Sequence, residues 1–473
     1  MTISQICICL AIAVYLIAML GVGVWFSKRN NSVDDFYLGG RKLGPFVTAM
    51  SAEASDMSSW LLMGLPGVAY LSGLAEASWT AIGLAVGTYL NWLIVARRIR
   101  RYSHQIDAIT VPQFFSKRWG DERNLLSAIA AVVIMIFFVP YLASGFSACG
   151  KLFASLFGIN YVSAMLISAA VIVIYTVMGG FLAASFTDLV QSIIMTVALV
   201  VVLGFGVAQA GGMEAVMDNA RSLAGYLSLV NIHDPATGGS APYSLLTICS
   251  LLAWGLGYFG MPHILLRFMA IEDEKKLVLS RRIASVWVVI AMTASIVIGM
   301  VGLGMTKAGA LEFLSGSSSE TLIVRVASLI AQHGVLAAIL AGLILAGILA
   351  ATMSTADSQM LASGLQRIPE HPAGVRPHEV DLMKSEPVRC PPDHHLHQRG
   401  GRGAGPRPQL QRVRHRQLCM GRFRRCVWCR DALRPVLEAL QLAGCAGRDA
   451  RRRPDGLCLE VPHQPAGRRV QHL

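Results

Sequence analysis

SAEASDMSSWLLMGLPG, residues 51–67, decides the fold, because it places a carboxylate inside an apolar segment. Asp56 is the one ionisable side chain of residues 54–67. An acid at bilayer depth is costly, and such acids mark ion or substrate sites by default. The stretch therefore predicts a membrane protein that uses Asp56 to bind a ligand. The alternative is a buried aspartate that caps a half-helix.

The neighbours of Asp56 indicate a broken helix that is rich in oxygen atoms. Small hydroxyl side chains flank the acid and helix-breaking residues follow it: Ser55, Ser58 and Ser59, then Gly64, Pro66 and Gly67. A break at bilayer depth frees backbone carbonyls. Together with hydroxyls and a carboxylate, these carbonyls replace the water shell of a hard cation such as sodium.

The composition is that of a membrane protein. The 473 residues are 54% hydrophobic and 15% charged, with a mean hydropathy of +0.53. Soluble globular proteins carry about 25% charged residues. The first apolar stretch, Ile6–Phe26, is too long for the core of a signal peptide and lacks a small-residue cleavage site. We therefore predict that it is a retained spanning helix.

Nine segments before residue 360 have about the length that a bilayer requires. They are residues 5–27, 43–73, 77–97, 124–151, 159–180, 187–210, 243–261, 283–306 and 334–356. Lysine and arginine gather in the odd-numbered connections, whereas the long connection 211–242 holds only Arg221. Because basic residues favour the cytoplasmic side, we predict a multi-pass membrane protein with its N-terminus outside.

The character of the chain changes near Gly364. Residues 366–473 hold 21 Arg and Lys against 10 Asp and Glu, and no segment among them is apolar for long enough to span a bilayer. Such a tail is typical of a nucleic-acid-binding arm or of a disordered cytoplasmic segment. Cys426 and Cys429 form a lone C-x-x-C that, with nearby histidines, suggests zinc. Neither interpretation has regular motif spacing.

A third interpretation is that the tail is translated out of register. A one-base shift turns Arg codons of the CGN type into codons for Gly, Ala, Val, Asp or Glu. In one constant frame, three segments become apolar under permissive codon choices: His395–Arg407, Cys426–Leu442 and Val461–Leu473. We therefore predict a transmembrane core over residues 1–363 and a frameshifted basic tail over 364–473 that is not a folded domain.

Residues 37–363 resemble the sodium/solute symporters, and most closely their sodium/proline branch. The shared motifs are YLGGRKLG (37–44), SAEASDMSSWLLMGLPG (51–67), FFVPYLASG (137–145), YTVMGGFLAASFTDLVQ (175–191), LLAWGLGYFGMPHILLRFMA (251–270) and LAATMSTADSQ (349–359). The resemblance implies an all-α polytopic membrane protein whose core is an inverted five-plus-five helix repeat. Here the second repeat would be truncated after three helices.

The resemblance also implies a sodium site. Its ligands would be the carbonyls of Ala54, Met57 and Ala351 with the hydroxyls of Ser354 and Thr355, and Asp56 would supply charge. The alternative for the two hydroxyls is bonding to preceding carbonyls of their own helix. Asp188 is either a second acid on the ion path or a cap for the helix expected at 187–210.

The implied substrate pocket consists of Ser58, Trp60, Tyr141, Trp254 and Tyr258. Four aromatic walls with hydroxyls and unwound backbone suit a small zwitterion with an apolar ring. The alternative is that these aromatics are interfacial anchors. Glycines at 255, 257 and 260 favour a second interrupted helix and hence the pocket.

The resemblance implies a secondary transporter rather than an enzyme, with Na+ as coupling ion, no organic cofactor and no nucleic-acid partner. The expected function is sodium-coupled symport of L-proline, impaired here by the tail. Ser59, Met261 and Glu53 depart from close relatives, so another small amino acid or solute remains an alternative. A non-functional remnant is a further alternative. A membrane sensor would need a signalling domain, and none is recognisable.

Overall fold

The computed structural model describes residues 2–28 and 33–364, and this part of the chain is almost entirely helical. Its first half contains α1 (Ile3–Ser27), α2 (Val33–Leu38), η1 (Gly39–Arg41), α3 (Pro45–Met57), η2 (Ser59–Leu61), α4 (Gly64–Ser72), α5 (Leu74–Leu90), the π-helical η3 (Asn91–Ala96), α6 (Arg97–Gln105), α7 (Val111–Trp119), α8 (Leu125–Phe157) and α9 (Tyr161–Gln209). The predicted tail, apart from Gly364, lies outside the described residues.

The second half of the described chain begins with α10 (Met213–Ser222) and a small antiparallel hairpin. There β1 (Asn231–His233) pairs with β2 (Ser240–Pro242), and Ile232 lies opposite Ala241. The elements that follow are α11 (Leu245–Ala253), η4 (Trp254–Phe259), α12 (Pro262–Ala270), η5 (Glu274–Lys276), α13 (Leu277–Lys307), η6 (Gly316–Thr321), α14 (Leu322–Ile330), η7 (Ala331–His333) and α15 (Val335–Gly364).

Among the described residues, six helices are long and apolar enough to cross a membrane. The number is seven if the bent pair Leu245–Phe259 and Pro262–Ala270 counts as one span. Two predicted spans, 159–180 and 187–210, fall in the single 49-residue α9. The predicted span 43–73 is divided among α3, η2 and α4.

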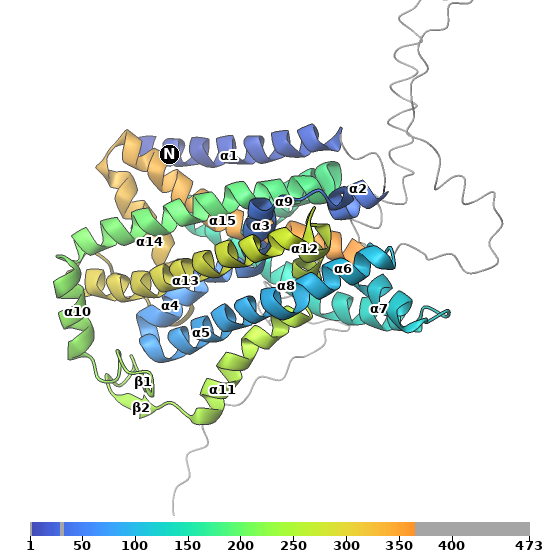
Figure 1. Cartoon of the computed structure of the whole chain (residues 1–473). Helices are drawn as coiled ribbons and strands as arrows, with labels where there is room; N and C mark the ends of the chain where they lie inside the picture. Colours follow the sequence, from blue (N-terminus) through green and yellow to red (C-terminus); the bar gives the residue numbers. More distant parts are fainter. Residues whose placement is uncertain (1, 29–32, 365–473) are drawn as a thin grey trace, which may run out of the picture.

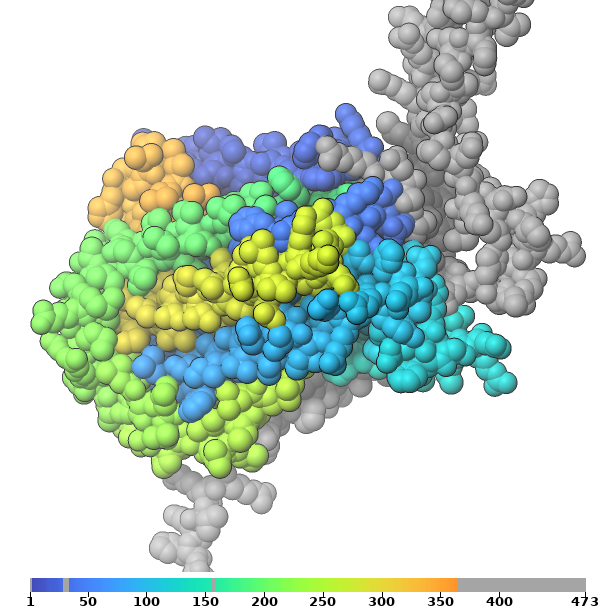
Figure 2. Space-filling view, viewed as in Figure 1, coloured from blue at the N-terminus to red at the C-terminus, as the bar shows by residue number. Residues whose placement is uncertain are grey.

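The long helices lie side by side, and α15 is central among them (Figure 1). In its most apolar window α15 is 67% buried. The corresponding values are 28% for α1 and 22% for the span Leu125–Ala154 within α8. Figure 2 shows α13 packed between α9 and α5. The outer faces of α1 and α8 expose large apolar side chains such as Ile17, Val132 and Phe137, which suits contact with lipid.

The break expected at Asp56 occurs at Ser58, two residues after the acid and before the glycines and the proline. Ser58 has a φ of +51° and a ψ of −172°, a conformation that residues other than glycine rarely adopt. Its Oγ accepts a hydrogen bond from the Trp60 amide at 3.2 Å, which stabilises the turn locally. Pro66 lies in the first turn of α4, where a helix tolerates proline.

A second break divides α9 at Gly180, whose φ of +61° and ψ of −159° are accessible almost only to glycine. A Cβ there would lie 2.8 Å from the Phe36 carbonyl oxygen. The residues on both sides of the break contact the same end of α1: Tyr175 lies against Gly23, and Phe186 against Phe26. The α9 helix is therefore two helices joined at Gly180.

Arg267 on α12 is fully buried and joins four helices. It forms an ion pair with Asp188 of α9 at 3.0 Å, and both side chains are 0% exposed. Its Nε donates to Ser51 Oγ of α3 at 3.0 Å, and Nη2 donates to Ser358 Oγ of α15. Ser51 in turn donates to Asp188 at 2.6 Å. We call these four residues the Arg267 cluster.

The capping role considered for Asp188 is wrong. The helix continues unbroken from Gly180 through Asp188, so residue 187 begins no helix. Thr187 donates to the carbonyls of Ala183 and Ala184, as a hydroxyl inside a helix does. Asp188 is instead the buried counter-ion of Arg267.

Replacing Arg267 by methionine should destabilise the fold by about 3–5 kcal/mol, because the variant leaves the Asp188 carboxylate buried without a cation. Adding Asp188→Asn to Arg267→Met should recover part of that loss, since the amide needs no counter-ion. Denaturant unfolding of the purified protein in detergent measures both changes.

Lys276→Gln is the matched control. It removes an ion pair with Glu272 whose side chains are 47% and 41% exposed, and it should change stability by less than about 1 kcal/mol. Equal stability of Arg267→Met and Lys276→Gln would contradict the structural role of the cluster.

Candidate functional site

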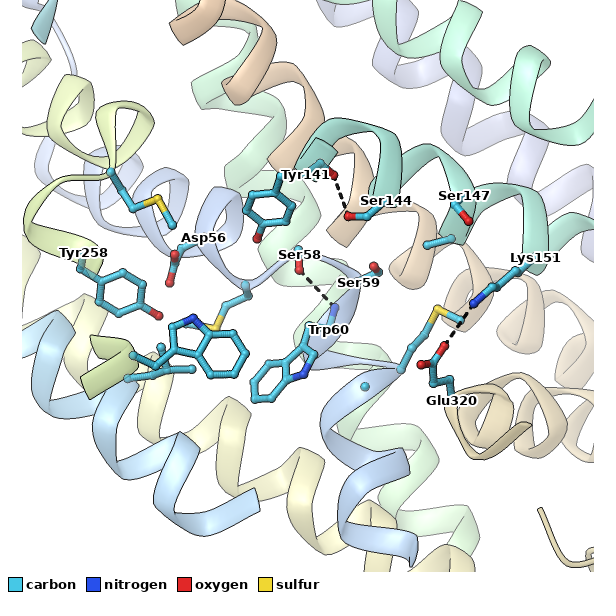
Figure 3. A pocket seen from close by; sticks show the side chains of 17 residues that line it. Asp56, Ser58, Ser59, Trp60, Tyr141, Ser144, Ser147, Lys151, Tyr258 and Glu320 are labelled. Carbon is cyan, nitrogen blue, oxygen red and sulfur yellow. Dashed lines mark hydrogen bonds and ion pairs between the residues drawn. The ribbon is translucent and has the colours of Figure 1, made fainter. Parts of the chain in front are cut away.

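A cavity of 470 Å³ opens beside the break at Ser58, and we call it the central cavity. All five residues predicted for the substrate pocket line it, together with Asp56 and Met57 (Figure 3). These residues come from three places in the chain: the α3–η2 junction, α8 and η4. The structure thus brings together residues that are far apart in the sequence.

Two tryptophans form one wall of the central cavity. The rings of Trp60 and Trp254 have centroids 5.2 Å apart and are tilted by 59°. Trp254 is 47% exposed, with part of its ring on the cavity surface, whereas Tyr258 is almost fully buried. Flat aromatic surfaces of this kind suit a small apolar ring or chain.

The polar side of the cavity is built on Asp56 and its partners. The Tyr258 hydroxyl interacts with the Asp56 carboxylate, and the Tyr141 hydroxyl interacts with Ser58. In Figure 3 both tyrosine rings point toward the end of α3. A carboxylate and three hydroxyls therefore face one apolar wall, an arrangement that binds a small molecule with both a polar and an apolar part.

Four of the predicted sodium ligands, Ala54, Ala351, Ser354 and Thr355, are connected by hydrogen bonds beside the same break. Ala54 and Met57 lie in the last turn of α3, where carbonyls lack partners within the helix. Ser354 Oγ donates to the Ala54 carbonyl at 2.8 Å and to the Ala351 carbonyl at 3.2 Å. Thr355 Oγ1 also donates to Ala351 at 3.2 Å.

This group of oxygens fits a hard monovalent cation. Ala54, Ala351 and Ser354 are 0% exposed, and their oxygens already lie within hydrogen-bond distance of one another. Sodium prefers such carbonyl and hydroxyl oxygens as ligands. The alternative of bonding within the helix holds for Thr355, whereas Ser354 also reaches across to α3.

The sequence did not point to two charged residues of the central cavity. Lys151 on α8 and Glu320 on η6 form an ion pair at 3.6 Å on its lining (Figure 3). Lys151 lies on the face of α8 that also carries Tyr141, Ser144 and Ala148, so helical spacing from Tyr141 contains a signal for it. Glu320 lies in a connection and has no such signal.

The three positions where we expect departures from relatives fall at the cavity or near the end of α3 beside it. Ser59 and Met261 line the cavity. Glu53 is 3% exposed and accepts a hydrogen bond from Trp92 Nε1 at 3.0 Å. These positions shape the space that a solute occupies, so they bear directly on which solute fits.

The π-helical segment η3 connects the two interrupted helices. Trp92 holds Glu53 of α3, and Asn91 Nδ2 donates to the Tyr258 carbonyl of η4 at 2.9 Å. Both η3 side chains are buried. π-helical turns within α-helices are often found at functional sites, and here the turn orients two side chains toward the cavity walls.

Comparison with known proteins begins with a family model. The model described as the sodium:solute symporter family matches residues 36–366. The osmoregulated proline transporter OpuE of Bacillus subtilis is 42% identical over 359 residues, which cover 75% of this chain and 69% of that protein. The sodium/proline symporter of Haemophilus influenzae is 42% identical over 357 residues, 74% of this chain and 68% of that protein.

Two further matches extend the comparison. The sodium/proline symporter of Escherichia coli is 40% identical over 352 residues, which cover 74% of this chain and 67% of that protein. A Na+-coupled sialic acid symporter solved in a substrate-bound outward-open state matches with a TM-score of 0.68 at 18% identity. That match covers 93% of this chain and 82% of the solved chain.

These matches confirm the predicted family and the predicted all-helical, multi-pass transporter fold, and with them a transporter rather than an enzyme. The truncation of the second repeat, the orientation in the membrane and the individual site residues stay predictions.

The wall of the cavity that carries Trp254 and Tyr258 depends on glycine contacts between η4 and α5. A Cβ on Gly255 would lie 2.0 Å from the Gly83 carbonyl oxygen and 3.0 Å from the Gly87 Cα. A Cβ on Gly257, in the same short helix, would have nothing within 4 Å.

Gly255→Ala should therefore destabilise the protein by about 1–3 kcal/mol and displace η4, because backbone atoms cannot yield to the new methyl group. Gly257→Ala should leave stability within about 0.5 kcal/mol of the wild type. Unfolding midpoints in detergent, with acrylamide quenching of tryptophan fluorescence as a readout of Trp254, measure both. Indistinguishable behaviour of the two variants would contradict this packing.

Proposed function

The chain belongs to the sodium:solute symporter family, and we propose that it couples the uptake of L-proline to sodium across a bacterial cytoplasmic membrane. Relatives about 40% identical are named for sodium and proline. The observation that carries the proposal is the position of the Ser58 break. The central cavity borders this break, and Ser354 of α15 donates to the Ala54 carbonyl in the last turn of α3 before it, which supports a sodium site beside the cavity.

The proposed sodium site and the central cavity share the end of α3. This shared element supplies a physical basis for coupling sodium binding to solute binding. Ala54 and Met57 would present carbonyls to sodium, and Ser58 and Trp60, the next residues, line the cavity. A cation held between α3 and α15 would fix the α3 end in one position, and a solute in the cavity would then meet ordered walls. Such reciprocal stabilisation is what linkage between two ligands requires.

Each predicted ligand has a definite task in this proposal. Ser354 and Thr355 would turn lone pairs toward the cation, with the carbonyls of Ala54, Met57 and Ala351 completing its shell. Asp56 lies in the same turn of α3 as Met57 and would add the negative charge that offsets the cost of burying a cation. Its contact with Tyr258 ties that charge to the substrate wall.

The shape and chemistry of the central cavity support proline or a similar small amino acid. A volume of 470 Å³ accommodates a small zwitterion with bound water. Trp60 and Trp254 would cover its ring, while Ser58, Tyr141 and Tyr258 would address its charged groups. We retain the predicted orientation, in which the N-terminus lies outside.

Thr355→Ala should raise the sodium concentration for half-maximal proline binding by about five- to tenfold, because one of about five oxygen ligands is lost. Asp56→Asn should abolish sodium-dependent binding. Equilibrium binding of radiolabelled proline to the purified protein across a sodium titration measures both variants.

Thr352→Ala is the matched control, since Thr352 lies on the same helix, is 2% exposed and donates only to the Ile348 carbonyl of its own helix. It should bind sodium as the wild type does. Sodium-dependent binding that survives in Asp56→Asn would remove the acid from the mechanism. Failure of excess unlabelled proline to displace the label would reject proline as the substrate.

A non-functional remnant is the second candidate, favoured by the change of composition in the tail. The family match ends at residue 366, where the basic segment begins. We propose that 364–473 is frameshifted and that transport by this chain is impaired. The alternatives for the tail, including zinc at Cys426 and Cys429, concern residues outside the described part.

Restoring a single reading frame between codons 364 and 390 should replace the Arg-rich segment by several apolar spans and confer sodium-driven proline uptake. Under this proposal the restored spans would cover apolar helix faces of the core, which is the physical reason for the expected gain. Sequencing of the coding DNA and uptake into vesicles are the measurements. Robust uptake by the 473-residue chain, or DNA without a continuous apolar frame, would refute the frameshift.

A further inference from the structure

A second large cavity lies away from the central one, in a groove between α6 and α7. Its volume is 680 Å³, and we call it the arginine groove. Tyr102 of α6 and Phe114 of α7 contact each other at 5.8 Å between ring centroids, so the two helices form its sides. Its polar lining contains four arginines: Arg97, Arg98, Arg101 and Arg118.

The positive charge of the groove is only partly compensated. Arg101 forms a two-pronged ion pair with Glu274 at 2.7 and 3.0 Å, and Arg97 approaches the same carboxylate at 3.6 Å. Within residues 2–28 and 33–364, no acidic side chain forms an ion pair with Arg98 or Arg118. The Arg118 guanidinium lies over the Tyr102 ring at 4.7 Å, which positions it at the groove.

The other side of the groove is apolar and open. Ile94 and Phe115 on its lining are each 40% exposed, and Phe259 extends the apolar lining. Ile94 stands near the end of the apolar part of the span Leu74–Gln105, and Arg97 and Arg98 follow it within about one turn. Apolar surface next to cationic surface is the pattern of a membrane–water boundary.

We propose that the arginine groove binds one anionic phospholipid, with its phosphate at Arg98 and Arg118 and an acyl chain against Ile94, Phe115 and Phe259. Guanidinium groups suit phosphate oxygens because they donate in a fork. A soluble phosphate ion has no acyl chain and would leave the apolar lining of the groove uncovered, so a lipid is the better match. The basic tail of the chain cannot supply the charge, since residues 366–473 are themselves strongly positive.

Native mass spectrometry of the full 473-residue protein in detergent tests the site. The probes are phosphatidylglycerol and phosphatidylcholine with identical acyl chains. Wild type should retain one phosphatidylglycerol with a preference of at least about tenfold over phosphatidylcholine. Arg98→Gln with Arg118→Gln should remove that preference, because each basic side chain near a membrane surface contributes substantially to binding anionic lipid.

Two controls separate this site from general basicity and from misfolding. Arg123→Gln with Lys275→Gln removes two exposed charges that do not line the groove, and it should keep the preference. Arg98→Lys with Arg118→Lys should keep most of it, since the charge remains. If the glutamine variant fails to fold, the single variants Arg98→Gln and Arg118→Gln should each lower the preference.

Three results would overturn the proposal. They are equal retention of the two lipids by wild type, an unchanged preference in the glutamine variants, and full displacement of the lipid by glycerol 3-phosphate, which has no acyl chain. The result is independent of whether the transported solute is proline, because no residue of the central cavity lines the groove.

Discussion

The contact on which the rest of the structure depends is that of Arg267 with Asp188, Ser51 and Ser358. A guanidinium that is 0% exposed is tolerated only where its charge and its donors are matched, and here three neighbouring helices supply the partners. The effect of this contact is to fix the positions of the helices relative to one another. It fixes α3 against α15 at Ser51 and Ser358, one turn before Ala54 on α3 and one turn after Ser354 on α15.

The spacing along α3 links this buried charge to the site. Ser51, Ala54 and Ser58 follow one another at about one turn each, so the cluster, the oxygen group and the cavity lie within about 10 Å of helix. The Arg267 cluster holds four helices together. This leaves the helices little freedom one turn away, where Ser354 donates to the Ala54 carbonyl. A cation site of weak individual ligands needs such rigidity, because backbone carbonyls and hydroxyls select an ion only when they are held in place.

The sequence predicted those parts of the structure that depend on the types of residues close together in the chain. Apolar length located the long helices, and Asp56 with its serines indicated the broken helix, whose break falls two residues after the acid, at Ser58. A positive φ at a serine leaves no mark in composition. It persists because Ser58 caps Trp60 and the surrounding helices hold both sides of the turn.

Partnerships between distant residues could not be predicted in the same way. Asp188 and Arg267 are 79 positions apart, and a single sequence carries no signal that pairs them, so a capping role for the acid was an equal alternative. Lys151 of α8 and Glu320 of η6 are likewise distant in the sequence and meet only at the lining of the cavity.

The same limit applies to η3, whose side chains bind the walls of the central cavity from behind. Trp92 holds Glu53 on one interrupted helix, and Asn91 holds the Tyr258 carbonyl on the other. A shift of either helix end would therefore strain the contact with η3 and through it the other helix. The helix that carries Glu53 and the short helix that carries Tyr258 are therefore joined through the two hydrogen bonds of η3.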